Sequence, residues 1–266
     1  MTIAAATGTS NASPDTDRRF GGLLRLHGLQ GYARLRGARV AVVGVGGVGS
    51  WAVEALARSG VATLVLIDLD QVAESNINRQ IQALDDTLGM AKVDALRERI
   101  ARIHPGCVVQ PVEDFVDEDN VARLLEPAQL DGVLDCCDQV RAKAAIAAWG
   151  LAHGRPVVSV GAAGGKLAPH LVEVADLADV THDPLLASVR QRLRQRHGGA
   201  RRGAMGLQCV FSREPVRPSQ EPACEVGVAP VPGAALACHG YGSSVMVTAS
   251  FGMVAAAQLT GLILAS

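Results

Sequence analysis

The stretch VAVVGVGGVGSW, residues 40–51, constrains the fold more than any other part of the sequence. A continuous apolar run leading to Gly44 predicts a buried strand, and apolar residues at helical spacing over 48–58 predict a helix directly after it. Between the two, Gly44, Gly46 and Gly49 match the pattern G-x-G-x-x-G. Because glycine has no side chain, phosphate oxygens can approach the N–H groups at the start of such a helix. The stretch therefore predicts a strand–turn–helix unit that binds a phosphate-bearing ligand.

Segments with strand and helix character alternate along most of the chain. Predicted strands lie at 62–67, 107–112, 132–137 and 156–160, and predicted helices at 92–103 and 140–152. Such alternation is typical of a mostly parallel, doubly wound sheet. Further strand-like segments at 170–177 and 209–212 look like an elaboration of the same domain. We expect an α/β fold, Rossmann-like, with a C-terminal elaboration.

The length of 266 residues suits one large α/β domain. Residues 1–17 lack the basic and apolar segments of a secretory signal and are predicted to form a disordered lead. Residues 18–266 are then a single domain with a basic insertion around 182–208. The apolar segment 243–264 is diluted by polar residues and has no basic flanks, which favours a buried packing helix and no membrane contact.

Charge and cysteine content exclude some classes of protein. Lys and Arg together number 25 and Asp and Glu 26, so the net charge of −1 gives no overall attraction to nucleic acid, and any basic surface is local. The six cysteines include no C-x-x-C pair, which argues against a disulfide framework and against a four-thiolate zinc site. We expect a cytoplasmic protein without zinc.

Charged residues follow the predicted strands. Asp68 ends the second strand and is expected to accept hydrogen bonds from ribose hydroxyls. Arg79 and Lys92 come next, and Asp138 follows the strand VLDCC. Two cations and an added carboxylate suit ATP and Mg²⁺ better than a nicotinamide dinucleotide.

Each of these three residues has a purely structural alternative. Lys92 could be a solvated helix side chain, Arg79 a partner in a loop salt bridge, and Asp138 the N-cap of the next helix. Taken together, they follow successive strands, where open α/β sheets bind their ligands. NAD-dependent oxidoreduction and non-enzymatic nucleotide binding remain open at this point.

Longer motifs resemble a known superfamily. The E1-like adenylating superfamily, which includes activators of ubiquitin-like and sulfur-carrier proteins, is similar in four motifs: GVGGVGSWAVEALARSG (44–60), D-x-D-x(5)-N-x-x-R-Q (68–80), GMAKVDAL (89–96) and DCCD (135–138). Its tRNA threonylcarbamoyladenosine dehydratase branch is similar in five more: RRFGGLLRLHG (18–28), NRQIQAL (78–84), VGAAGGK (160–166), HDPLLASVRQRL (182–193) and CVFSREP (209–215).

The resemblance implies an activity and a site. It implies ATP-dependent dehydration, by cyclisation, of N6-threonylcarbamoyladenosine at position 37 of tRNA through an acyl adenylate. The phosphate loop would comprise Gly44, Gly46, Gly47 and Gly49, and Asp68 would hold the ribose. Asn76, Arg79 and Lys92 would contact phosphates and Asp138 would bind Mg²⁺; Arg79, Lys92 and Asp138 are the expected catalytic residues. A structural monovalent cation is compatible with the resemblance.

The resemblance also bears on partners. Related proteins are dimers, and the apolar C-terminal helix needs cover, so we expect a homodimer. The arginine that related dimers supply from the partner subunit has only Arg19 and Arg25 as candidates. The alternative function is activation of a carrier protein or sulfur transfer to it, with Cys238 as the relay thiol and a cysteine desulfurase and a sulfur acceptor as partners. Missing C-x-x-C pairs disfavour that alternative.

The segment RQRLRQRHGGARRG, 190–203, contains six arginines and no acid. Such concentrated charge in a neutral chain favours a surface that follows tRNA phosphates over a merely solvated helix. The tRNA-binding candidates are Arg190, Arg192, Arg194, Arg201 and Arg202. With two Trp, two Tyr and four Phe in the chain, we expect little base stacking.

Overall fold

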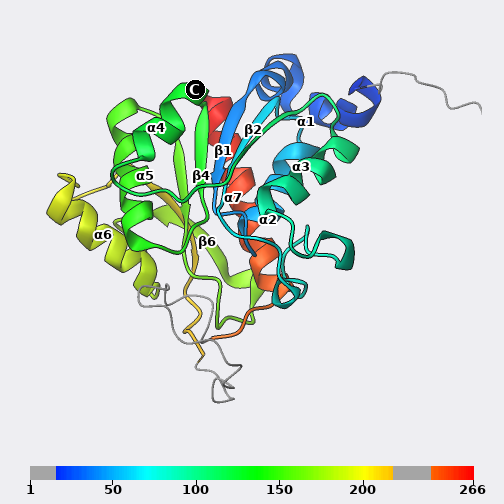
Figure 1. Ribbon diagram of the computed structural model, residues 1–266. Coiled ribbons are helices and arrows are strands. Elements are labelled where there is room, and N and C mark those ends of the chain that lie inside the picture. The colour runs from blue at the N-terminus through cyan, green and yellow to red at the C-terminus, as the bar shows by residue number, and fades with distance from the viewer. Residues whose placement is uncertain (1–15, 218–240) are drawn as a thin grey trace, which may run out of the picture.

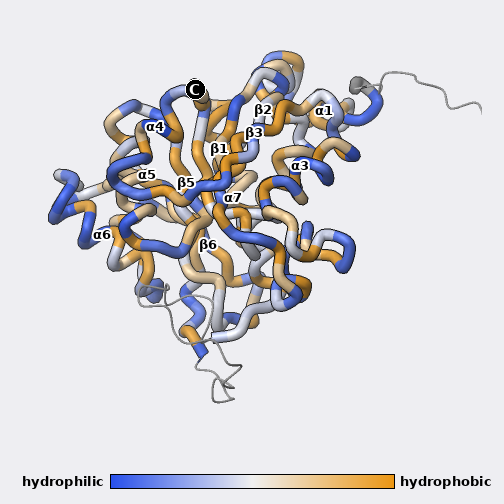
Figure 2. Tube along the Cα trace, in the orientation of Figure 1, coloured by the Kyte–Doolittle hydropathy of each residue, from blue (hydrophilic) through white to orange (hydrophobic). Residues whose placement is uncertain are grey.

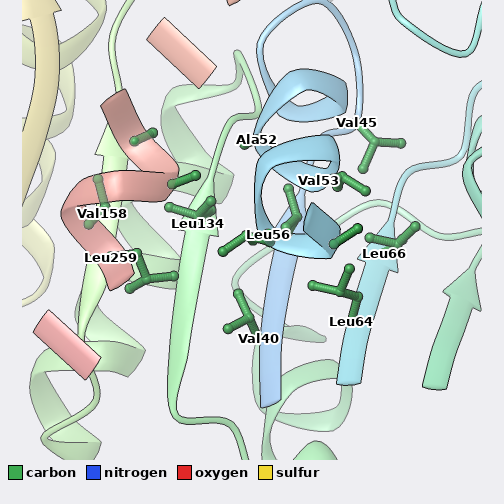
Figure 3. Packing of buried hydrophobic residues seen from close by; sticks show 14 of the residues in the cluster. Val40, Val45, Ala52, Val53, Leu56, Leu64, Leu66, Leu134, Val158 and Leu259 are labelled. Atoms are coloured by element: carbon green, nitrogen blue, oxygen red, sulfur yellow. The ribbon is translucent and has the colours of Figure 1, made fainter. Parts of the chain in front are cut away.

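The predicted strand–turn–helix unit is present in the computed structural model, which describes residues 16–217 and 241–266. β1 (Arg39–Val43) leads through the glycine turn into α2 (Gly49–Arg58). α2 lies along the sheet and buries Ala52, Val53 and Leu56 against the strands (Figure 3). Cys238 lies outside the described residues, and the predicted disordered lead does so up to residue 15.

Seven strands and seven α-helices make up the described chain. The other strands are β2 (Thr63–Ile67), β3 (Val108–Val112), β4 (Gly132–Asp135), β5 (Val157–Val160), β6 (Val172–Asp176) and β7 (Gln208–Ser212). The other helices are α1 (Thr16–Gly37), α3 (Lys92–Ile103), α4 (Val121–Leu125), α5 (Val140–His153), α6 (Pro184–Arg196) and α7 (Val245–Ala265). Short 3₁₀ turns lie at Glu74–Asn76, Asp85–Thr87, Glu126–Ala128 and Pro169–Leu171. Between residues 39 and 160, every predicted element agrees with the structure to within two residues.

The strands form one sheet in the order β3-β2-β1-β4-β5-β7-β6. All neighbouring pairs are parallel except β6 and β7, which confirms the α/β fold with a mostly parallel sheet. After β3 the chain returns to the other side of β1, so β1 and β4 flank a topological switch point. In the register, Val43 pairs with both Ile67 and Asp135, so three strands end level with one another.

Helices cover both faces of the sheet (Figure 1), the central strands are hydrophobic (Figure 2), and one apolar core lies on each face. Alternate residues of β1 face opposite ways, with Val40 and Val42 in one core and Ala41 and Val43 in the other. The first core is covered by α2, α3 and α7, and the second by α5, α6 and the α4 region. Burial on both faces explains why the strands read as continuous apolar runs.

Helix α1 has no counterpart among the predicted elements. Its apolar residues form no single stripe, since Leu26 and Leu29 remain exposed, and Gly28 interrupts it with φ +68°. Tertiary contacts hold α1 instead: the Arg34 Nη1 donates to the Leu264 carbonyl at 2.6 Å, and Phe20 packs edge-on against His104.

Helix α7 is the one helix in the described ranges that is long and apolar enough to cross a membrane, judged by length and composition. Its inner face is buried in the protein, where Phe251, Ala255 and Leu259 join the core beneath α2 (Figure 3). Gly252 allows close approach to α2, because a Cβ there would contact the Ala52 nitrogen at 3.0 Å.

Candidate functional site

The glycine turn after β1 requires glycine at two positions. Gly44 has φ +80°, and a Cβ there would approach the Cys137 nitrogen at 2.8 Å. A Cβ on Gly49 would overlap the carbonyl oxygen of Gly44. The loop 44–49 is therefore folded tightly against the end of β4, and larger residues at these two positions would displace it.

The N-terminus of α2 is left open towards this loop. Its N-cap residue, Val48, makes no side-chain capping bond, and the first turn contains no acidic residue. The first N–H groups of a helix have no partner within the helix and carry partial positive charge. An anion is therefore the group that this end of α2 suits best.

Asp68 fixes the loop from the neighbouring strand. Its Oδ2 accepts from the Val45 N–H at 2.7 Å and its Oδ1 from the Asp70 N–H at 2.9 Å. Burial raises the pKa of Asp68, and the Lys92 ammonium partly opposes this. The carboxylate thus lies beside the glycine loop and fixes it, and its contact with a ribose stays a prediction.

Lys92 opens α3 and is buried, with 6% of its surface exposed. Its Nζ donates to Asp70 Oδ2 at 2.6 Å, although that carboxylate is itself largely exposed. The structure thereby excludes the solvated-side-chain alternative for Lys92. A buried ammonium is held at the site edge with one exposed partner.

Arg79 lies over the glycine loop. A Cβ on Gly47 would be 3.3 Å from Arg79 Cγ, and the Trp51 indole donates to the Arg79 carbonyl at 2.9 Å. The guanidinium donates to the Ser75 carbonyl and to Asn78 Oδ1. Among the residues described, Arg79 makes no salt bridge, and its guanidinium is held only by these two oxygens.

Asn76 is placed differently from Arg79. It is buried, and its Oδ1 accepts from the Ala73 N–H at 3.1 Å, which closes its own 3₁₀ turn. This bond shapes the loop that carries Arg79.

Two glutamines that lie at the glycine loop were not predicted from the sequence. Gln82 is buried and donates to the Val45 carbonyl at 3.1 Å, and it also donates to Gln80 Oε1 at 3.1 Å. Gln80 Nε2 would lie 3.8 Å from a Cβ on Gly46. The motif NRQIQAL contains both residues, but no spacing rule distinguishes a loop-supporting glutamine from a solvated one.

Asp138 follows β4 on the other side of the glycine loop. The N-cap of α5 is Gln139, without a side-chain capping bond, so Asp138 is not the cap. Within residues 16–217 and 241–266, no hydrogen bond or ion pair engages its carboxylate. A half-exposed, unpaired carboxylate beside a phosphate-type loop is chemically suited to Mg²⁺, which keeps several waters and takes few protein ligands.

The thiols near this loop are poorly ionised. Burial raises the pKa of Cys136 to about 12, and burial together with the Asp135 carboxylate raises the pKa of Cys137 well above its usual value. Since the thiolate is the nucleophile, neither thiol is activated.

The arginines of 190–202 differ in availability. Arg190 donates to the Leu177 and Val180 carbonyls, and Arg192 pairs with Glu118 at 2.6 Å. The Arg194 Nε donates to the Ala200 carbonyl, while Arg201 and Arg202 are exposed.

The arginine-rich end of α6 is remote from the glycine loop. Asp183 caps α6 and accepts from the Ala162 N–H just beyond β5, so the helix starts at the carboxyl edge of the sheet. Met205 and Gly206 bond to Asp176, which ends the antiparallel strand β6 at the opposite edge (Figure 1). The 13 residues of α6 span about 20 Å between the two edges.

Arg19 and Arg25 lie on α1. Arg19 donates to the Ile103 carbonyl at 2.6 Å and lines a hollow of about 350 Å³ with Arg58 and Arg102. Arg25 is exposed. The hollow lies at the carboxyl ends of α2 and α3, away from the glycine loop, so it is not the nucleotide site.

The fold and this edge of the sheet define a doubly wound nucleotide-binding protein, and comparisons with known proteins are consistent with that class. The family model described as "ThiF family" matches residues 20–265. The tRNA threonylcarbamoyladenosine dehydratase of Escherichia coli is 43% identical over 243 residues, which cover 90% of each chain. The Haemophilus influenzae enzyme of the same name is 38% identical over 247 residues, covering 91% of this chain and 92% of its own.

Solved structures lead to the same group. The crystal structure of the E. coli dehydratase in complex with ATP matches with a TM-score of 0.83 and 40% identity, covering 95% of this chain and 96% of the other. Its complex with AMP matches with a TM-score of 0.85. The chain therefore belongs to the ThiF family and, within it, to the tRNA threonylcarbamoyladenosine dehydratases.

Proposed function

We propose that this chain uses ATP to dehydrate and cyclise the threonylcarbamoyl group on adenosine 37 of tRNA. A carboxylate oxygen of that group attacks the α-phosphorus of ATP, and the bond to pyrophosphate breaks. A heteroatom of the carbamoyl unit in the same group then attacks the activated carbonyl carbon and loses a proton, and the bond from that carbon to the AMP oxygen breaks. The observation that best supports this proposal is the convergence of an uncapped helix N-terminus, two cations and a half-exposed carboxylate, which has no partner among the described residues, on one edge of the sheet.

Each residue has a proposed task in adenylation. The N–H groups of loop 44–49 and α2 hold phosphate oxygens, and Asp68 holds the ribose while it fixes Val45. Arg79 and Lys92 offset the charge that builds up on the phosphates during transfer, which is the main demand of such chemistry. Asn76 acts through the loop that presents Arg79.

The unpaired Asp138 carboxylate fits Mg²⁺, since hard oxygen ligands and phosphate oxygens are what this ion prefers. When bound, Mg²⁺ stabilises negative charge on the transferring group. The described residues contain no cluster of three or more His, Cys, Asp or Glu side chains that could hold a metal by themselves. That agrees with an ion held by one carboxylate together with ATP.

For tRNA we propose the outer end of α6 as a phosphate-contacting surface. Arg201 and Arg202, in the loop that follows α6, are exposed, as is Arg196 at its last position, and Arg192 and Arg194 are available in part. A stem extending from a nucleotide at the carboxyl edge would run along α6 towards them. Arg190 supports the fold of this surface, since its guanidinium is held by two carbonyls.

Further proposals concern the assembly and its surroundings. We propose a cytoplasmic homodimer, in which Arg19 or Arg25 reaches the partner's site. A structural monovalent cation is part of the same proposal. Light scattering at micromolar concentration tests the dimer, and a monomer would contradict it.

The decisive experiment is mass analysis of nucleosides from tRNA carrying threonylcarbamoyladenosine, incubated with the protein and ATP. We expect a nucleoside lighter by one water, with AMP formed in equal amount. Sulfur transfer is the second candidate, with Cys238 as the thiol. Incubation with a cysteine desulfurase and cysteine tests this candidate: a persulfide that forms on the wild-type protein and is lost in Cys238→Ser would favour the relay, and no persulfide on the wild type would contradict it.

A further inference from the structure

A fully buried ion pair lies beneath the loop that carries Asp138. Lys143 and Asp135 are both 0% exposed, and the Lys143 Nζ donates to Asp135 Oδ2 at 3.0 Å. Ser159, also 0% exposed, donates to the same Oδ2 at 2.6 Å. Although burial lowers it, the Asp135 carboxylate holds the pKa of Lys143 above its usual value. The cluster is therefore charged and internally satisfied.

Stability by itself does not account for this cluster. Taking two charges out of water is costly, and apolar residues of similar volume are often as stabilising or more so. The surrounding strands are apolar: Leu134 precedes Asp135, and Val158 and Val160 flank Ser159. Three apolar residues in place of Asp135, Lys143 and Ser159 would continue the core, so the presence of these three polar residues needs another explanation.

The cluster joins the two ends of the Asp138 loop. Asp135 is the last residue of β4, and Lys143 lies in the first turn of α5, so their contact closes the loop between them. Lys143 also donates to the Asp135 carbonyl at 3.2 Å. Inside the loop, the Cys137 thiol donates to Asp135 Oδ1 at 2.9 Å.

The same loop is held against the phosphate loop. The Cys136 N–H donates to the Val43 carbonyl at 2.8 Å, and Gly44 has no room for a Cβ beside Cys137. A shift of the loop would therefore change the distance from Asp138 to residues 44–49. Helix-end capping does not fix it, since no side chain caps α5.

We propose that Asp135, Lys143 and Ser159 are positioning residues that fix the Asp138 carboxylate relative to the phosphate loop. This inference rests on the proposed function, in which Asp138 serves Mg²⁺ and ATP. Groups that orient a metal-binding carboxylate typically change metal affinity or activity by about 10–100-fold when removed.

The principal test is the double variant Asp135→Asn/Lys143→Met, which removes both charges together and leaves no unpaired ion. We expect it to fold, with faster hydrogen exchange at residues 136–139. Calorimetry should give an ATP affinity in EDTA within about twofold of wild type, while the gain in affinity on adding Mg²⁺ falls roughly tenfold. Turnover at a fixed Mg²⁺ concentration should fall together with this gain in affinity.

Lys166→Met is the matched control, because Lys166 is also buried but donates to the Ser212 and Glu214 carbonyls, away from the Asp138 loop. It should lower stability and leave the Mg²⁺ effect unchanged. Ser159→Ala and Ser159→Thr provide a milder pair should the double variant not fold. Thr keeps the hydroxyl, so it should restore the Mg²⁺ effect that Ala weakens.

An unchanged Mg²⁺ effect and unchanged exchange in a folded double variant would overturn the inference. So would an equal loss in Lys166→Met, since the effect would then follow stability. If the wild-type protein formed no cyclised nucleoside, the proposed function would be contradicted. The assay of the wild-type protein therefore distinguishes failure of the proposed function from failure of the positioning role.

Discussion

The phosphate-loop edge and the outer end of α6 are both rich in charge, yet they use it differently. At the loop, the Asp138 carboxylate has no partner among the described residues and no side chain caps the α2 N-terminus, so both groups can interact with a ligand. On α6, Arg190 is held by two carbonyls and Arg192 by Glu118. The density of charge in a sequence therefore does not measure how much of it is free to bind.

The two regions also differ in how many separate segments build them. Loop 44–49, Asp68, the 76–82 segment and Asp138 come from four parts of the chain that the sheet brings level. The α6 arginines belong to one continuous segment. We therefore expect a single substitution at the phosphate-loop edge to cause a large loss of ATP binding or turnover. A single substitution among the arginines of 190–202 should cause only a small loss of tRNA binding.

Asp138→Ala should have the largest effect. Turnover should fall by about 100-fold or more, because the carboxylate that we propose for Mg²⁺ and phosphoryl transfer is lost. Binding of tRNA should stay level, since α6 is untouched. Single-turnover assays and filter binding measure the two effects, with the exposed Asp119→Ala as the control. Equal loss of tRNA binding would show that the two regions are not separate.

Gly49→Ala should disrupt the loop itself. The added Cβ overlaps the Gly44 carbonyl oxygen, so we expect a free energy of unfolding lower by about 1–3 kcal/mol and loss of ATP binding. Gly261→Ala, where the structure leaves open space on α7, is the control. Urea unfolding and calorimetry report both quantities, and a wild-type ATP affinity would show that the loop tolerates displacement.

Asp68→Ala should weaken ATP binding by about 10–100-fold, because a charged hydrogen bond is worth about 1.5–3 kcal/mol. Asp70→Ala should have a smaller effect, since its pair with Lys92 is largely exposed on the Asp70 side. Calorimetric titration with ATP distinguishes them. If the two variants lose the same affinity, Asp68 acts on the loop through general electrostatics and not on the ribose.

The smallest effect is expected on α6. We consider Arg201 and Arg202 changed to Gln. The slope of the logarithm of the tRNA binding constant against the logarithm of salt concentration should become smaller in magnitude by roughly 0.7–0.9 for each lost phosphate contact. Arg190→Gln should leave that slope unchanged and lower stability, because its carbonyl partners lose a charged donor. If the slope changed only in Arg190→Gln, then Arg190 and not Arg201 or Arg202 would contact tRNA phosphates.

Much of the fold was predictable because both faces of the central strands are buried. Burial produced the apolar runs at β1, β2, β4 and β5, and the glycine pattern identified the turn at residues 44–49. Helix α1 was not predictable in this way, since it depends on contacts with Leu264 and His104, far along the chain. Gln82 was missed for the same reason, since it bonds to Val45. Lys143 was missed because it meets Asp135 and Ser159 only once β4 and β5 lie side by side.

The sequence by itself determined the class of the protein, because a strand, a glycine turn and a helix are local features fixed by backbone sterics and apolar periodicity. Its motifs also identified Asp68, Arg79, Lys92 and Asp138 as candidates. Only the tertiary structure decided which charges are available. It paired Arg190 with carbonyls, gave Asp138 no partner within the described part of the chain, and closed the Asp138 loop with Asp135 and Lys143. Whether a charged side chain is available to a ligand depends on which groups lie next to it in the folded protein, and the local sequence does not specify those neighbours.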